Sequence, residues 1–131
     1  MHSMTQQQDS VVIGGVDAHA DTHHAAALDA RGALLGTREF AATSTGYEQL
    51  FEWLRGFGRV ETVAVESTSS YAAGLTRALL AHEIKVVEVN QPHAHTRRRR
   101  GKTDAIDAET AARRYLAGDG IAIPKADQRD R

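Results

Sequence analysis

An almost uninterrupted apolar run near the amino terminus, at residues 11–17, most constrains the fold. Its sequence is Val-Val-Ile-Gly-Gly-Val-Asp, so no polar residue interrupts it before the closing aspartate. A strand that is apolar on both sides must be covered on both sides, whereas a half-exposed strand alternates polar and apolar residues. The run therefore predicts the central strand of a sheet that is flanked by helices.

The length and composition predict one domain in a cytoplasmic protein without membrane contact. The chain has 131 residues, enough for a single hydrophobic core, and no cysteine, which excludes disulfides, thiolate zinc sites and cysteine nucleophiles. It begins without the basic and apolar blocks of a signal peptide, and no apolar run reaches the roughly 20 residues that span a bilayer. We expect a disordered tail at residues 1–10, a domain at residues 11–120 and a truncated tail at residues 121–131.

Two further strands follow the first after short turns, at residues 24–29 and 33–40, and predict an antiparallel meander. An amphipathic helix follows at about residues 45–57, because its apolar residues are spaced three and four apart. Thr45 and Glu48 fit a capping box at the start of this helix.

The second half of the domain predicts strands that alternate with helices. Strands are expected at residues 60–66 and 85–89, and the helix between them implies parallel pairing. The hydroxyl side chains of residues 67–70 are expected to start this helix, with Tyr71, Leu75 and Leu79 on its inner face. A last helix is expected at residues 104–116. This order is that of the ribonuclease H-like fold: a five-stranded mixed α/β sheet, its first three strands antiparallel, flanked by helices.

Four acidic residues stand where segments should meet at one edge of this sheet. Asp17 and Glu66 each close a strand, and the carboxyl ends of neighbouring parallel strands face the same edge. Asp104 and Asp107 are three apart in a helix and so share one helical face. Carboxylates that converge need a cation between them, and oxygen ligands suit Mg²⁺ or Mn²⁺. Singly, each of the four has an ordinary explanation as a turn former or a helix cap.

A basic run lies directly before the acidic pair, at Arg97, Arg98, Arg99, Arg100 and Lys102. Residues 85–131 contain 11 Lys and Arg against 7 Asp and Glu, whereas residues 1–84 contain 5 against 10. Such a run predicts contacts with nucleic-acid phosphates, or else a solvated loop.

Histidines gather after the first strand, and His19, His23 and His24 raise the alternative of a zinc site. A polar turn explains them more simply, because no fourth soft ligand is evident.

Four segments resemble the DEDD transposases of insertion sequences, the group related to the Piv DNA invertases. They are Gly-Val-Asp-Ala-His at residues 15–19 with Asp-Thr-His at residues 21–23, Val-Glu-Ser-Thr-Ser-Ser-Tyr at residues 65–71, Asn-Gln-Pro at residues 90–92 and Gly-Lys-Thr-Asp-Ala-Ile-Asp-Ala at residues 101–108. The resemblance implies a RuvC-like nuclease domain whose catalytic and metal-binding tetrad is Asp17, Glu66, Asp104 and Asp107. It also implies Mg²⁺-dependent cleavage and transfer of DNA strands, a homo-oligomer, and in some members a structured guide RNA.

The resemblance implies in addition a second, carboxyl-terminal domain with a nucleophilic serine, which the sequence does not contain. Ser67, Ser69 and Ser70 are not expected to replace that serine. We therefore expect the chain to be incomplete as a recombinase.

Two alternatives remain open at this point. One is a non-catalytic module that binds nucleic acid or supports assembly. The other is an ATP-binding domain of the actin-like sugar-kinase type, because the hairpin after Asp17 also resembles the phosphate-binding hairpin of those proteins. The kinase-type alternative leaves the segment from Lys102 to Asp107 unexplained.

Overall fold

The computed structural model describes residues 10–66, 70–89, 104–118 and 121–122. For Ser70, Asp104, Ile121 and Ala122 it describes the backbone alone. The elements in chain order are β1 (Val11–Ala18), β2 (Thr22–Asp29), β3 (Leu34–Ala41), α2 (Ser44–Arg55), β4 (Arg59–Glu66), the short 3₁₀ helix η1 (Ser70–Ala72), α3 (Ala73–Ala81), β5 (Lys85–Val89), α4 (Asp104–Ala117) and β6 (Ile121–Ala122).

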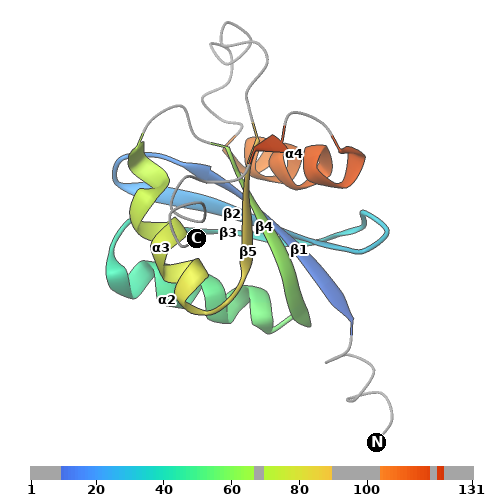
Figure 1. Cartoon of the computed structure of the whole chain (residues 1–131), viewed down its shortest axis with the longest axis horizontal. Coiled ribbons are helices and arrows are strands. Elements are labelled where there is room, and N and C mark those ends of the chain that lie inside the picture. Colours follow the sequence, from blue (N-terminus) through green and yellow to red (C-terminus); the bar gives the residue numbers. More distant parts are fainter. Residues whose placement is uncertain (1–9, 67–69, 90–103, 119–120, 123–131) are drawn as a thin grey trace, which may run out of the picture.

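The strands form one mixed sheet in the order β3-β2-β1-β4-β5-β6, and the first strand of the chain lies inside it (Figure 1). β1, β2 and β3 pair antiparallel, whereas β4 runs parallel to both β1 and β5. This confirms the predicted ribonuclease H-like topology. The short strand β6, which pairs antiparallel with β5, was not predicted.

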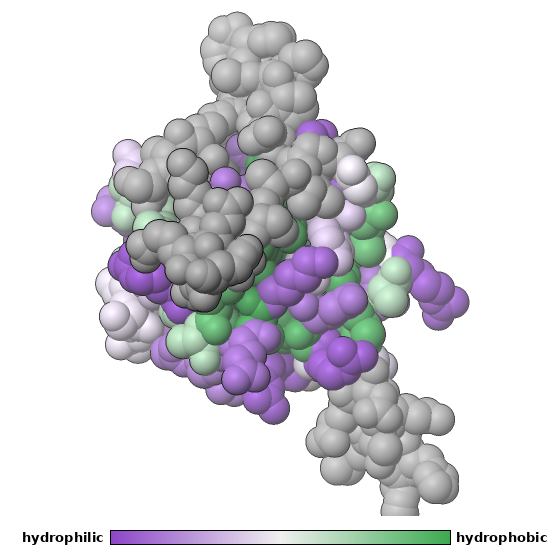
Figure 2. All heavy atoms as spheres, viewed as in Figure 1, coloured by the Kyte–Doolittle hydropathy of each residue, from purple (hydrophilic) through white to green (hydrophobic). Residues whose placement is uncertain are grey.

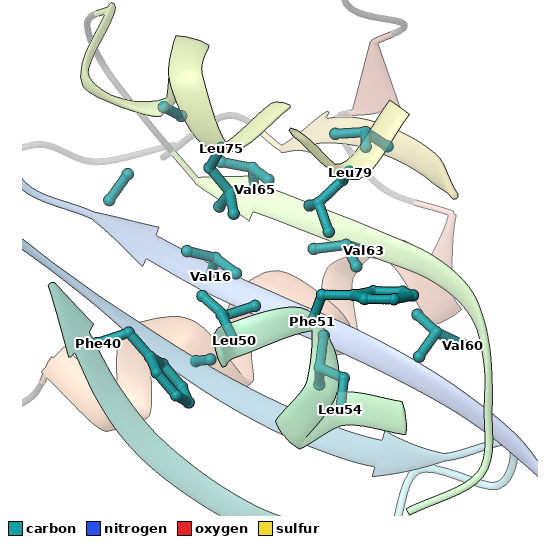
Figure 3. Close-up of a cluster of buried hydrophobic side chains, with 14 of the residues drawn as sticks. Val16, Phe40, Leu50, Phe51, Leu54, Val60, Val63, Val65, Leu75 and Leu79 are labelled. Atoms are coloured by element: carbon teal, nitrogen blue, oxygen red, sulfur yellow. The ribbon is translucent and has the colours of Figure 1, made fainter. Parts of the chain in front are cut away.

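Helices α2 and α3 cover one face of the sheet, and the main hydrophobic core lies beneath them. Even-numbered residues of β1, such as Val12 and Val16, point into this core. There they pack with side chains of the two helices, including Leu50, Leu54, Leu75 and Leu79. Figure 3 shows these four leucines around Val16. Alternate residues of a strand face opposite sides, so the odd-numbered residues of β1 face the other layer.

Helix α4 covers that other face and approaches β1 very closely (Figure 1). Ile13 packs with Ala112, and a methyl group on Gly15 would overlap the backbone oxygen of Ala108. The bare backbone at Gly15 therefore allows α4 to lie directly on the central strand. This contact decides where the amino-terminal turn of α4 is held.

Two expectations about helix starts are wrong. The residue that caps α2 is Thr43, not Thr45, because the Thr43 hydroxyl oxygen accepts a hydrogen bond from the Gly46 amide at 3.0 Å. Helix α3 begins after η1 without a side-chain cap, and Tyr71, which was expected on its inner face, is 52% exposed.

No helix of the described residues is long and apolar enough to cross a membrane.

Candidate functional site

Asp17 and Glu66 lie directly beside each other at the carboxyl ends of β1 and β4. The parallel register pairs the two residues, and neighbouring strands are about 4.8 Å apart. Both side chains point toward the α4 face, because Asp17 follows Gly15 by two residues and Glu66 follows Ala64, which packs with Ala111. The two carboxylates therefore share one edge and one face of the sheet.

Both acidic residues are buried, at 5% exposure for Asp17 and 6% for Glu66. Two negative charges about 5 Å apart repel by about 3 kcal/mol at an effective dielectric constant of 20. Buried charges of one sign are tolerated when a cation or hydrogen-bond donors neutralise them. Two carboxylates that converge on one edge are thus a donor set that fits a hard divalent cation.

The first turn of α4 is directed at the same edge. Tyr115 near the end of the helix bonds with Thr62, and Ala112 and Ala108 lie over Ile13 and Gly15. The helix therefore runs back along the sheet from the carboxyl end of β1 toward its beginning. Its amino-terminal turn, which begins at Asp104 and includes Asp107, lies on the Asp17 side.

The structure describes the Asp107 side chain as half-buried, while the Asp104 side chain lies outside the description. Among the side chains it describes, no three of the ligand-forming types are close enough to hold a metal ion. Of the predicted tetrad, the strand register pairs Asp17 with Glu66, and α4 brings its first turn toward them. The role of all four as ligands stays a prediction.

Two histidines lie beside Asp17, and neither was predicted as its neighbour. The Nε2 atom of His19, a half-exposed residue, lies 2.8 Å from Asp17 Oδ2, within hydrogen-bond distance. His24 is the partner of Asp17 in the antiparallel register of β1 and β2, so it shares the α4 face. The turn that sets this pairing is closed by the hydrogen bond from the His19 amide to the Thr22 oxygen at 3.0 Å, which the sequence alone does not show.

His23 points to the opposite face, which separates it from His19 and His24. Its ring stacks on Tyr47 of α2 with centroids 5.7 Å apart, and it is fully buried. Burial lowers the pKa of His23 below its ordinary value of 6.5. Neither ring nitrogen meets a well-placed hydrogen-bond partner in the described part of the chain. A zinc site shared by His23 and His24 does not fit, because adjacent residues of one strand face opposite ways.

The predicted nucleic-acid contacts at Arg97, Arg98, Arg99, Arg100 and Lys102 lie outside the described residues.

The fold and the site define a class: a ribonuclease H-like domain with paired buried carboxylates at the carboxyl edge of its central strands. The family model described as a transposase, the DEDD transposase of the IS110 group, matches residues 14–130. The chain therefore belongs to the DEDD transposase family.

The chain is also similar to a solved structure titled "T. thermophilus RuvC in complex with Holliday junction substrate". The two are 15% identical with a TM-score of 0.48, over 87% of this chain and 82% of that one. No curated protein matches the chain in sequence.

Proposed function

We propose that this chain is the nuclease-type domain of a DEDD transposase and performs metal-dependent phosphodiester chemistry on DNA. Asp17, Glu66, Asp104 and Asp107 are its proposed catalytic and metal-binding residues. The observation that carries the proposal is the register of β1 and β4, which sets two buried carboxylates side by side. The family assignment favours this function over an ATP-binding domain.

Each carboxylate has a distinct part in the proposal. Asp17 on the central strand would hold the divalent cation together with Glu66 on one side and the two aspartates of α4 on the other. Mg²⁺ or Mn²⁺ held by these residues would supply charge that stabilises the attacking and leaving oxygens of an in-line displacement. Two packed strands and a closely held helix would fix the geometry of the proposed ligands before DNA binds.

The residues proposed to hold the nucleic acid are Arg97, Arg98, Arg99, Arg100 and Lys102, which precede the acidic turn of α4. Cationic side chains of this kind position a strand through its phosphates and do not read its sequence. We propose DNA as the substrate, a structured guide RNA and further copies of the chain as partners, and the cytoplasm as the compartment.

Cleavage of labelled duplex and branched DNA by the purified chain tests the proposal, with Mg²⁺ or Mn²⁺ present and then removed by EDTA. We expect metal-dependent cleavage by the natural sequence and a loss of at least about 100-fold in Asp17→Asn, which keeps the shape but removes a charged ligand. The matched control is Asp21→Asn, because Asp21 is an exposed residue of the turn after β1.

Cleavage by Asp17→Asn at the rate of the control, or cleavage that survives EDTA, contradicts the proposal.

A second candidate function is a passive nucleic-acid-binding domain, and the contact between His19 and Asp17 favours it. A ring within hydrogen-bond distance of Asp17 Oδ2 occupies one of the oxygens that a cation would use. DNA binding that is indifferent to metal and unchanged in Asp17→Asn would select this candidate.

A further inference from the structure

A hollow with a cavity volume of about 530 Å³ lies at the end of the sheet opposite to the acidic edge. It is bordered by the last residue of α2, the turn into β4 and the residue after α3. The lining residues are Phe51, Arg55, Gly58, Arg59, Val60, His82 and Ile84. None of these is acidic, so the hollow is a basic pocket, and we use that name for it below.

The aromatic ring of Phe51 lies against two of the side chains that line the pocket. The Arg55 guanidinium lies 5.7 Å from the centre of this ring, and the His82 ring stacks on it at 4.0 Å. His82 Nε2 is also 2.7 Å from Glu48 Oε1, so His82 is already engaged with a carboxylate. The two arginines are therefore the groups with charge to offer a ligand.

Neither Arg55 nor Arg59 forms an ion pair with a carboxylate among the residues that the structure describes. Both are exposed, and they flank the basic pocket from the end of α2 and the start of β4. In the view of Figure 2, hydrophilic side chains gather at the lower border, where Figure 1 places the end of α2 and the start of β4. A guanidinium presents several N–H donors to a phosphate, so two arginines without a carboxylate partner at the border of one hollow suit a phosphate ligand.

Helix capping does not account for these arginines. The backbone oxygens of Glu52, Trp53, Leu54 and Arg55 accept hydrogen bonds from the amides of Gly56, Phe57 and Gly58 at 3.0–3.2 Å. The last turn of α2 is thus closed by its own backbone, and no guanidinium is needed to satisfy it.

We infer that the basic pocket binds a phosphate group of a nucleic-acid strand through Arg55 and Arg59. It is separate from the acidic edge, because Arg59 and Glu66 are the two ends of β4, about 23 Å apart along an extended strand. The pocket also lies on the α2 and α3 face, whereas the carboxylates face α4. It would therefore hold a different segment of the nucleic acid from the one at Asp17, about seven nucleotides away at 3.4 Å per step.

Amide chemical shifts of the whole 14.2 kDa chain test the inference when duplex DNA is added in EDTA, without divalent metal. We expect perturbations at residues 55–60 and 82–84. Inorganic phosphate is titrated separately to distinguish the free anion from a strand. The test variant combines Arg55→Gln with Arg59→Gln. The matched control combines Arg31→Gln with Arg77→Gln, which removes two exposed arginines outside the pocket lining.

Affinity is then measured across salt concentrations. Loss of two phosphate contacts makes the slope of log affinity against log salt less steep by about 1.8. The gain in affinity between 1 M and 0.1 M salt is then roughly 60-fold smaller in the variant than in the natural chain. The control pair should keep the natural slope and an affinity within about twofold, because residues that touch no phosphate release no counterions.

Several results overturn the inference: an equal loss in both pairs, perturbations confined to α4 and the acidic edge, or a response to inorganic phosphate but not to DNA. If DNA shifts the amide signals of the basic pocket but the chain shows no metal-dependent cleavage, the inference is supported and the proposed nuclease function is contradicted. An absence of any DNA binding overturns both.

Discussion

Replacing Gly15 by alanine tests the close packing that holds α4 over the central strand. The added methyl group would overlap the Ala108 oxygen and would lie 2.8 Å from the Ala112 nitrogen and 2.9 Å from its Cβ. Comfortable contacts between such atoms are about 3.5–4.0 Å, so α4 must move away by about 1 Å. Backbone atoms cannot rotate out of the way as side chains can.

The expected cost follows from two opposing effects. Overpacking of this kind destabilises by about 1–3 kcal/mol. The loss of glycine flexibility in the unfolded chain returns about 0.4–1 kcal/mol. We expect Gly15→Ala to lower the free energy of unfolding by about 1–2 kcal/mol, which shifts the urea midpoint down by about 0.5–1 M for a domain of this size.

Gly14→Ala is the matched control on the same strand. Its methyl group would meet side-chain atoms only, Leu54 Cδ1 at 3.0 Å and Val63 Cγ2 at 3.2 Å, and these can give by a few tenths of an ångström. We expect a change within about 1 kcal/mol. Urea unfolding of both variants decides the matter: equal midpoints for Gly15→Ala and the natural chain, or equal losses in both variants, would refute the packing argument.

Three other predictions concern stability. Because burial lowers the pKa of His23, the folded chain binds fewer protons than the unfolded chain, so stability should fall as the pH drops below about 6.5. His23→Phe should flatten that decline in urea unfolding, and an unchanged pH profile would contradict it. Thr43→Ala should cost about 1 kcal/mol and Thr45→Ala less, because Thr43 supplies the cap of α2, and the reverse order in urea unfolding would reject that cap. Leu79→Ala should cost about 2–5 kcal/mol in the same assay, because Leu79 is fully buried in the main core, and a loss below 1 kcal/mol would contradict that packing.

The strand order could be predicted because each strand has a local signature. The apolar run of residues 11–17 required cover on both faces, and β5 begins at Lys85 and ends at Val89, as expected from its sequence. The short turns around the first three strands leave few alternatives to an antiparallel meander. The alignment of Asp17 with Glu66 then follows from topology, since both residues close parallel neighbours.

The start of α2 was predicted wrongly because two neighbouring residues offer the same capping group. Thr43 and Thr45 both carry a hydroxyl that can cap a helix, and the turn out of β3 decides between them. Gly46 packs against the backbone of Ala41 so closely that a methyl group there would overlap the Ala41 oxygen. The helix therefore starts earlier than the capping-box pattern predicts.

Contacts that depend on strand register were beyond the sequence. His24 was expected to begin the second strand, whereas β2 begins at Thr22, and only the observed pairing places His24 opposite Asp17. The approach of His19 to Asp17 likewise depends on the turn geometry after β1. Composition and spacing contain no information on either contact.

Binding of Mn²⁺, followed by calorimetry and by the electron paramagnetic resonance of the free ion, tests the central claim most directly. The paired carboxylates predict saturable binding to the natural chain and to Asp21→Asn, with affinity at least about tenfold weaker in Asp17→Asn and in Glu66→Gln. Equal affinity in all four chains would contradict a cation site between β1 and β4.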